Sequence, residues 1–445
     1  MREQVLSLVF TALLVAGCGQ VRPSDAADAD GKVRAQAIVL SNLRGLTMPQ
    51  LYVPDPNDRV NCAVNEFSMP GQGYWVSDAV GGLSYAPVTS SVSAGKVGAG
   101  LQSGFFTGAT LKRSMVILIA DDFKNGVFNV GNALFTQTTL DQPTIQNLQQ
   151  TGALSHGALV ARHARDVLLG TGRYSFVSYN SGEWVYKEAS TNSRFTVKAI
   201  DTGLSSSAVI ADKIKTYLQF LALKNQTAVV NLSFALMPCG VKSDFEQWDA
   251  QNSGVQTFEG YMQALATLNT VDYDALVAAI VESTNLPNDP LLGLINNTAY
   301  GAARHVYVAA SGNFSLKYSM YPANWKNVVN VTGSTASSGP DGRVRNDKLF
   351  NQGEIMHTAA SLVLNPPPLL LNGKKVYYLG TSFSAPTVSV FSALDLAGWL
   401  KCGGGTGVSK LAVNSLGLVD RHLEDWVVSG QVQQKGAVSE LCTGP

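Results

Sequence analysis

The sequence predicts an α/β fold, in which a parallel sheet carries helices on both faces and one helical insertion interrupts the pattern. The first observation is a set of apolar runs without alternating polar positions, as is typical of strands buried on both faces. They are 115–120, 227–232, 306–310 and 328–331. The second observation is that stretches with apolar residues at helical spacing lie between these runs.

The elements follow in the order that such a sheet requires. Residues 105–445 form the predicted domain, which begins with strand 115–120, helix 156–169, strand 195–200 and helix 208–223 and continues with the later apolar runs. Residues 240–303 hold two helical stretches, near 260–268 and 272–281, and are interpreted as the insertion. Residues 19–104 combine a flexible tether with a region of no clear pattern, which either a removable propeptide or a permanent domain would explain.

Composition limits the function classes. Of the 445 residues, 45% are apolar and 14% are charged, which indicates a globular protein that buries a sizeable core. Lysine plus arginine equals aspartate plus glutamate, at 32 each, and no basic stripe stands out. We therefore expect no nucleic-acid partner, and we expect a monomer.

The N-terminus predicts a lipoprotein signal peptide over residues 1–18. Arg2 precedes the apolar run 5–15, which is too short to span a bilayer but fits a signal-peptide core. The run leads into Ala16-Gly17-Cys18, which resembles a bacterial lipobox, where the cysteine is lipidated. An ordinary secretory signal is the alternative. We expect an exported protein of the bacterial cell envelope, anchored to the membrane by a lipid on Cys18.

One serine has the surroundings of a nucleophile. The turn Gly380-Thr381 delivers Ser382 to the start of an apolar, helix-forming run. A helix N-terminus offers unpaired N–H groups and the positive end of the helix dipole, which stabilise an oxyanion. A simple N-cap serine is the alternative. Serine needs a base, and His156, which begins a helix and is followed by Gly157, is the best candidate of the five histidines.

An acid and an amide complete the set of candidates. Asp121 and Asp122 follow the first apolar run, at the sheet edge where ligands bind in open parallel sheets. Asp121 is preferred because it follows the strand directly, and Asp122 stays open as the alternative. Asn313 comes just after another apolar run, where its amide would donate to an oxyanion. A plain Ser-Gly-Asn turn is the alternative there.

Together these segments resemble the subtilisin-like serine peptidases, the subtilases, over about residues 114–400. The segments, in the family's order, are Asp121 after its strand, His156-Gly157, Val230-Asn231-Leu232-Ser233, Ala309-Ala310-Ser311-Gly312-Asn313 and Gly380-Thr381-Ser382. The resemblance implies a subtilisin-like fold with Ser382 as nucleophile, His156 as general base and Asp121 as its orienting acid. Asn313 and the N–H of Ser382 would form the oxyanion hole.

The resemblance also implies where a peptide binds. The segment from Ser233 would pair with an extended substrate as an added strand, and Gly312 would contact the same substrate. Ala235 and Leu236 stand where the family often has glycines, which predicts a narrower pocket and cleavage after small or medium residues.

Export places the four cysteines after Cys18 in an oxidising compartment. We expect Cys402 to pair with Cys442, which leaves Cys62 to pair with Cys239. None of them forms a CxxC, so no zinc site, metal or cofactor is assigned. Many subtilases bind calcium, but no loop here is assigned to it.

The sequence therefore predicts an exported, lipid-anchored serine endopeptidase that acts on a protein or peptide. The alternative is a catalytically inactive subtilase-fold lipoprotein that binds a peptide or protein partner. An esterase of the α/β-hydrolase type is disfavoured, because no Gly-x-Ser-x-Gly surrounds Ser382 and the acid and base precede the serine.

Overall fold

The structure is a computed structural model, and its described part is not continuous. The described residues are 60–64, 75–77, 114–123, 155–191, 193–251, 258–302, 304–313, 319–338, 344–345, 355–358, 369–371, 374–378 and 381–397. The predicted signal peptide, with Cys18, and the predicted Cys402–Cys442 pair lie outside these residues.

Nine of the described strands form a central sheet in the order β11-β10-β9-β7-β3-β6-β5-β4, with β12 also paired to β10. The parallel strands are β3 (Met115–Asp121), β6 (Arg194–Asp201), β7 (Ala228–Leu232), β9 (Val306–Ala310), β10 (Val329–Ser338) and β12 (Ile355–Thr358). Antiparallel strands extend the sheet on both sides, namely β4 (Tyr174–Asn180), β5 (Glu183–Glu188) and β11 (Val344–Arg345). The predicted parallel sheet is confirmed.

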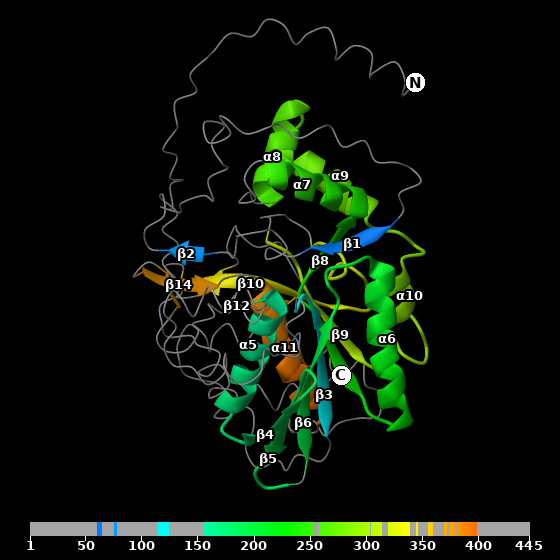
Figure 1. The fold of residues 1–445 in the computed structure, drawn as a ribbon, viewed down its shortest axis with the longest axis vertical. Helices are drawn as coiled ribbons and strands as arrows, with labels where there is room; N and C mark the ends of the chain where they lie inside the picture. The colour runs from blue at the N-terminus through cyan, green and yellow to red at the C-terminus, as the bar shows by residue number, and fades with distance from the viewer. Residues whose placement is uncertain are drawn as a thin grey trace, which may run out of the picture.

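Helices cover both faces of this sheet (Figure 1). Helices α5 (His156–Gly170) and α11 (Thr381–Leu396) pack together on one face, and α6 (Ser207–Leu223) covers the other. Every residue of β3 is buried, and alternate residues such as Val116 and Leu118 join the same core cluster as Ile210 of α6. Since neighbouring side chains of a strand point to opposite faces, the intervening residues face α5 and α11. Burial on both faces explains why β3 reads as an unbroken apolar run.

The insertion after β7 is richer in helices than predicted. It holds α7 (Cys239–Gln251), α8 (Phe258–Leu268), α9 (Tyr273–Ser283) and α10 (Pro290–Ile295), of which α8 and α9 correspond to the two predicted stretches. Among the described helices none is by itself long and apolar enough to cross a membrane; α8 and α9 meet that test only together, and they are bent by 109°.

Two small sheets join segments from the N-terminal region to later parts of the chain. Strand β1 (Asn61–Val64) pairs antiparallel with β8 (Ala235–Pro238), as Figure 1 shows. Strand β2 (Trp75–Ser77) pairs with β14 (Lys374–Tyr378), which in turn pairs with β13 (Leu369–Leu371). The disulfide Cys62–Cys239 connects β1 to the first residue of α7. It spans 177 residues of sequence, so it closes a very long loop.

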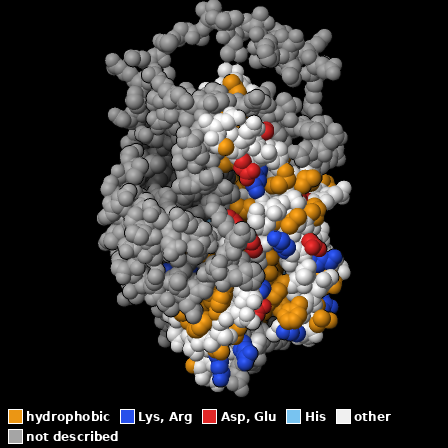
Figure 2. Space-filling view, viewed as in Figure 1, with side chains coloured by type: hydrophobic (Ala, Val, Ile, Leu, Met, Phe, Trp, Pro, Cys, Tyr) orange, Lys and Arg blue, Asp and Glu red, His pale blue; other side chains and the backbone are white. Residues whose placement is uncertain are grey.

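The face drawn in Figure 2 mixes apolar and charged side chains. On α6, Val209, Phe220 and Leu223 are exposed, with Lys224 lying 3.8 Å from the centre of the Phe220 ring. In the described part of this face, both basic and acidic side chains lie among the apolar ones.

One buried histidine is expected to make the stability of the fold depend on pH. His305, just before β9, accepts a hydrogen bond of 3.2 Å from the N–H of Ala228 through Nδ1. Burial, and after it the charge of Arg304, lowers the pKa of His305 from 6.5 to about 4. Between these two values the unfolded chain binds a proton that the folded chain does not. The free energy of unfolding should therefore fall as the pH drops from about 6.5 to about 4, by up to ~3 kcal/mol.

Urea unfolding of the wild type and of His305→Asn at pH 7, 5.5 and 4 measures this contribution. The asparagine amide oxygen is attached to Cγ, as Nδ1 is, so it can still accept from Ala228 but does not titrate. The variant should lose less stability than the wild type over this range. Equal losses would show that His305 does not contribute.

Candidate active site

Asp121 and His156 form a buried pair at the carboxyl end of β3. Nδ1 of His156 lies 2.8 Å from Oδ1 and 2.9 Å from Oδ2 of Asp121. Both residues are almost fully enclosed, with 0% and 2% of their surface exposed. A carboxylate against Nδ1 keeps the proton on that nitrogen, so in the neutral ring Nε2 is the nitrogen without a proton. The arrangement holds one histidine tautomer in place.

The local sequence around His156 explains this placement. Ser155 caps α5, its hydroxyl accepting from the N–H of Ala158 at 3.4 Å. The N–H of Gly157 donates to the carbonyl oxygen of Asp122 at 2.8 Å. A Cβ at position 157 would lie 2.7 Å from that oxygen and 2.8 Å from the Phe123 ring, so only glycine fits here. This close backbone approach at Gly157 brings the start of α5 against the end of β3.

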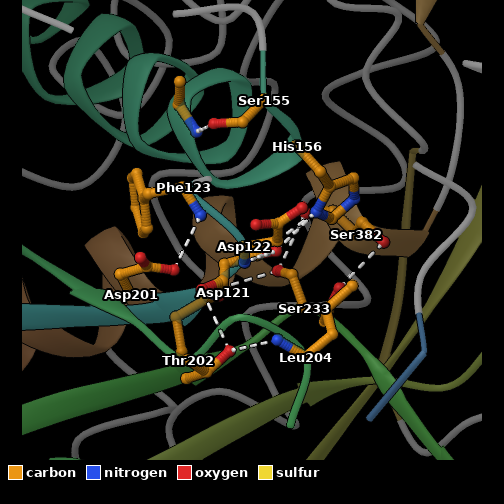
Figure 3. Close-up of polar contacts among 12 residues, drawn as sticks. Asp121, Asp122, Phe123, Ser155, His156, Asp201, Thr202, Leu204, Ser233 and Ser382 are labelled. Carbon is orange, nitrogen blue, oxygen red and sulfur yellow. Dashed lines mark hydrogen bonds and ion pairs between the residues drawn. The ribbon is translucent and has the colours of Figure 1, made fainter. Parts of the chain in front are cut away.

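Ser382 is the second residue of α11 and lies at the same end of the sheet (Figure 3). Its hydroxyl donates to the carbonyl oxygen of Ser233 at 3.2 Å. In Figure 3 the His156 ring is directed toward Asp121 on one side and Ser382 on the other. The ring of Phe383, the next residue, lies 6.0 Å from the His156 ring. The structure thus brings Asp121, His156 and Ser382 together from β3, α5 and α11.

A proline in α11 accounts for a second contact between Ser382 and Ser233. Pro386 has no N–H, so it cannot donate to the carbonyl oxygen four residues earlier, which is that of Ser382. The hydroxyl of Ser233 donates to this carbonyl instead, at 3.0 Å. The backbone at Ser382 is therefore fixed by the residue just after β7.

Two further buried residues, Asn231 and Ser389, support Ser233, and neither is among the site residues predicted from the sequence. Nδ2 of Asn231 donates to the Ser233 hydroxyl at 2.7 Å, and the Ser389 hydroxyl donates to Oδ1 of Asn231 at 3.0 Å. The chain of bonds runs from α11 through β7 and back to α11. In the sequence, Pro386 is the signal that the carbonyl oxygen of Ser382 receives no hydrogen bond from the helix backbone.

A buried histidine joins the two helices of this face. Nε2 of His163 lies 2.8 Å from the Thr387 hydroxyl, and its ring lies 6.1 Å from that of Phe383. His163 is fully enclosed. It is packed between the two helices, and its contacts hold α5 against α11.

Asn313 lies beside the first residue of α11. Its Oδ1 accepts from the Thr381 N–H at 2.9 Å and from the Thr381 hydroxyl at 3.0 Å. Since a backbone N–H can only donate, this contact fixes which side of the amide is oxygen and directs the NH₂ group away from Thr381. Gly312 has φ of 109°, which favours glycine, and its N–H donates to the Thr381 hydroxyl at 3.3 Å. The segment 311–313 is thereby tied to the start of α11.

The segment after Ser233 is largely enclosed. Leu236 has no exposed surface and donates its N–H to the Tyr321 carbonyl at 2.7 Å, while Ala235 is 8% exposed. Both belong to β8, whose partner is β1. Within the described residues, no group of three or more His, Cys, Asp or Glu side chains is placed to hold a metal ion.

The sequence of this chain matches the profile of the Subtilase family (Peptidase_S8) over residues 177–402, which is just over half of its length. The chain belongs to the subtilase family. The match includes Ser233, Asn313 and Ser382, whereas Asp121 and His156 precede it. No curated protein matches this subtilase sequence.

Several solved structures are similar to this subtilase at low identity. The prenylagaramide maturation protease PagA has 15% identity and a TM-score of 0.34, with 74% of this chain and 94% of that chain covered. A cold adapted subtilisin-like serine proteinase has 14% identity and a TM-score of 0.32, with coverage of 73% and 90%. The PatG macrocyclase in complex with peptide has 12% identity and a TM-score of 0.36, with coverage of 75% and 94%. None of these similarities assigns a role to a residue of this chain.

Proposed function

We propose that this subtilase is an exported serine endopeptidase that hydrolyses peptide bonds through an acyl-enzyme on Ser382. The observation that carries the proposal is the hydrogen bond of His156 Nδ1 to both oxygens of Asp121. Ser382 lies on α11, the helix that packs against the helix of His156. This geometry supplies what a weak serine nucleophile needs, namely a base of fixed tautomer held by a carboxylate.

In the proposed first step, Oγ of Ser382 attacks the carbonyl carbon of the peptide bond while its proton passes to Nε2 of His156. His156 then gives this proton to the leaving amine, and the peptide C–N bond breaks. Water then attacks the acyl carbon and gives a proton to Nε2 of His156. His156 passes this proton to Oγ of Ser382 as the ester bond breaks, which releases the carboxylic acid product. Asp121 keeps its charge and stabilises the imidazolium that forms in each half. The hydroxyl of Ser382 must turn from the Ser233 carbonyl toward His156 for the attack.

The oxyanion would be held by the N–H of Ser382 at the start of α11 and by the NH₂ of Asn313. The two hydrogen bonds from Thr381 to Oδ1 of Asn313 support this role. They fix the oxygen of the amide toward Thr381, so its NH₂ group points in another direction. Donors held in place in advance need not reorganise when the charge develops.

Reaction with a fluorophosphonate tests the proposal. An activated Ser382 should be labelled in the folded protein at neutral pH, and mass spectrometry of the peptides should place the label on that residue. Labelling should stop in Ser382→Ala and on unfolding in urea. A folded wild-type protein that takes no label would instead support the inactive, peptide-binding subtilase. Export and lipidation of Cys18 belong to the same proposal, and the mass of the mature N-terminal peptide tests them.

Asn313→Ala should lower kcat by ~10²–10³ with little change in KM, the loss known for removing one such donor in subtilisin rather than a value derived from this geometry. Asn327→Ala is a matched control, because Asn327 bonds to Asn296 at the surface, far along the chain from the turn at Thr381. It should keep the wild-type kcat. A variant of Asn313 with normal kcat and raised KM would show a role in binding only.

A further inference from the structure

The edge of β8 that leads away from the proposed nucleophile is already occupied by another strand of the same chain. β8 begins two residues after Ser233, whose carbonyl oxygen contacts the Ser382 hydroxyl. An extended peptide with its reacting carbonyl at Ser382 would pair first with Ser233 and Phe234 and then with Ala235 and its successors. The antiparallel partner of Ala235 is Val64 of β1, and Ala63 lies opposite Leu236.

β1 uses hydrogen bonds on both of its sides. On the side away from β8, the N–H of Ala63 donates to the Ser205 carbonyl at 3.1 Å, and Cys62 forms an antiparallel bridge with Ser206. β1 is thus the middle strand of a short antiparallel arrangement. The opposite side of β8 is also engaged, since the Leu236 N–H donates to the Tyr321 carbonyl. A peptide strand cannot pair with backbone groups that already have partners.

Several contacts fix β1 to the rest of the domain. Nδ2 of the buried Asn61 donates to the Thr284 carbonyl at 2.9 Å and to Oδ2 of Asp289 at 2.8 Å. Asp289 itself caps α10, so the same carboxylate fixes β1 and a helix of the insertion. The disulfide to Cys239 and the full burial of Ala63 add to this hold.

We propose that β1 restricts the substrate of this peptidase to pairing over at most two residues before the scissile bond, those opposite Ser233 and Phe234. The inference rests on the proposed function and names its substrate class: peptides recognised through a short stretch on the N-terminal side of the cleaved bond. Longer peptides still react, but residues further from the bond add no main-chain pairing. Ala63 and Val64 are then specificity-determining residues, because their strand closes the edge.

Two peptide phosphonates test this inference on the full chain with its disulfide intact. The nucleophilic serine of a peptidase attacks such a probe and becomes covalently modified. One is an N-blocked dialanine diphenyl phosphonate, and the other is the N-blocked tetra-alanine analogue. The second-order rate of Ser382 modification should differ by no more than threefold between them. A tetra-alanine rate more than threefold higher would overturn the inference, since an open edge gives the longer peptide additional hydrogen bonds. If neither probe modifies Ser382, the proposed function itself fails, and the inference with it.

Hydrogen exchange gives a second readout that needs no variant. The backbone amides of residues 235–237 should be as protected in the free protein as in the tetra-alanine adduct. Added protection at these amides in the adduct would show that a peptide pairs with β8 and would overturn the inference. Measuring both adducts separates pairing at β8 from a general tightening of the site.

Discussion

Ser382→Ala is expected to lower kcat for peptide hydrolysis by about 10⁶, the loss found when the nucleophile of a serine peptidase of this family is removed. The hydroxyl is the group that would form the acyl-enzyme, and Ser382 is the second residue of α11. The fold should be retained, because the side chain loses only its bond to the Ser233 carbonyl. One such bond contributes about 0.5–1.5 kcal/mol. Turnover of a fluorogenic peptide and a urea unfolding curve measure both effects.

Ser392→Ala is the matched control for this change. Ser392 lies on the same helix, is buried, and donates its hydroxyl to the Val388 carbonyl at 2.7 Å. The same chemical change there should leave kcat within about twofold of wild type, which assigns the loss at position 382 to chemistry. Substantial hydrolysis by Ser382→Ala would contradict the mechanism.

Asp121→Asn is expected to lower kcat by about 10⁴ at neutral pH while the protein stays folded. The carboxylate accepts from Nδ1 of His156 through both oxygens. An asparagine presents an NH₂ on one side, which favours the tautomer with the lone pair on Nδ1 and the proton on Nε2. The ring then cannot accept the Ser382 proton. Steady-state kinetics of the variant across pH 6–9 measure the loss.

Two nearby acids serve as controls for this prediction. Asp201 ends β6 directly opposite Asp121 and binds backbone N–H groups of Phe123 and Gly203. Asp201→Asn should keep kcat within about tenfold of wild type. Asp122→Asn distinguishes the two acids between which the sequence leaves a choice. If Asp122→Asn loses as much activity as Asp121→Asn, or more, the assignment of Asp121 as the orienting acid is wrong.

The parallel part of the sheet could be predicted from sequence because burial on both faces leaves a direct mark. Strands β3, β7 and β9 are buried along their whole length, and each reads as an apolar run. The β4–β5 hairpin lacks that mark, since β4 is mostly exposed. Its signal is the two-residue turn Ser181-Gly182, where both residues have positive φ.

The pairing of β1 with β8 could not be predicted by the same reasoning. Four residues are too few to show a period, and the partner strand lies far along the sequence. The contacts around Ser233 were missed for another reason. A hydrogen bond from Asn231 to Ser233 depends on how β7 meets α11, which no spacing along one segment specifies. By contrast, Asp121, His156 and Ser382 each stand at the end of an element, where the sheet edge collects them.

The Cys62–Cys239 disulfide also determines how any cleaved form of this protein would look. A single cut in the backbone anywhere between these two residues would produce two chains that stay joined by the disulfide. On a non-reducing gel such a product would run close to the intact protein, and only reductant would separate its parts. An N-terminal piece that is cut off between these cysteines would therefore stay attached through Cys62. It is released without reductant only if the cut falls before residue 62.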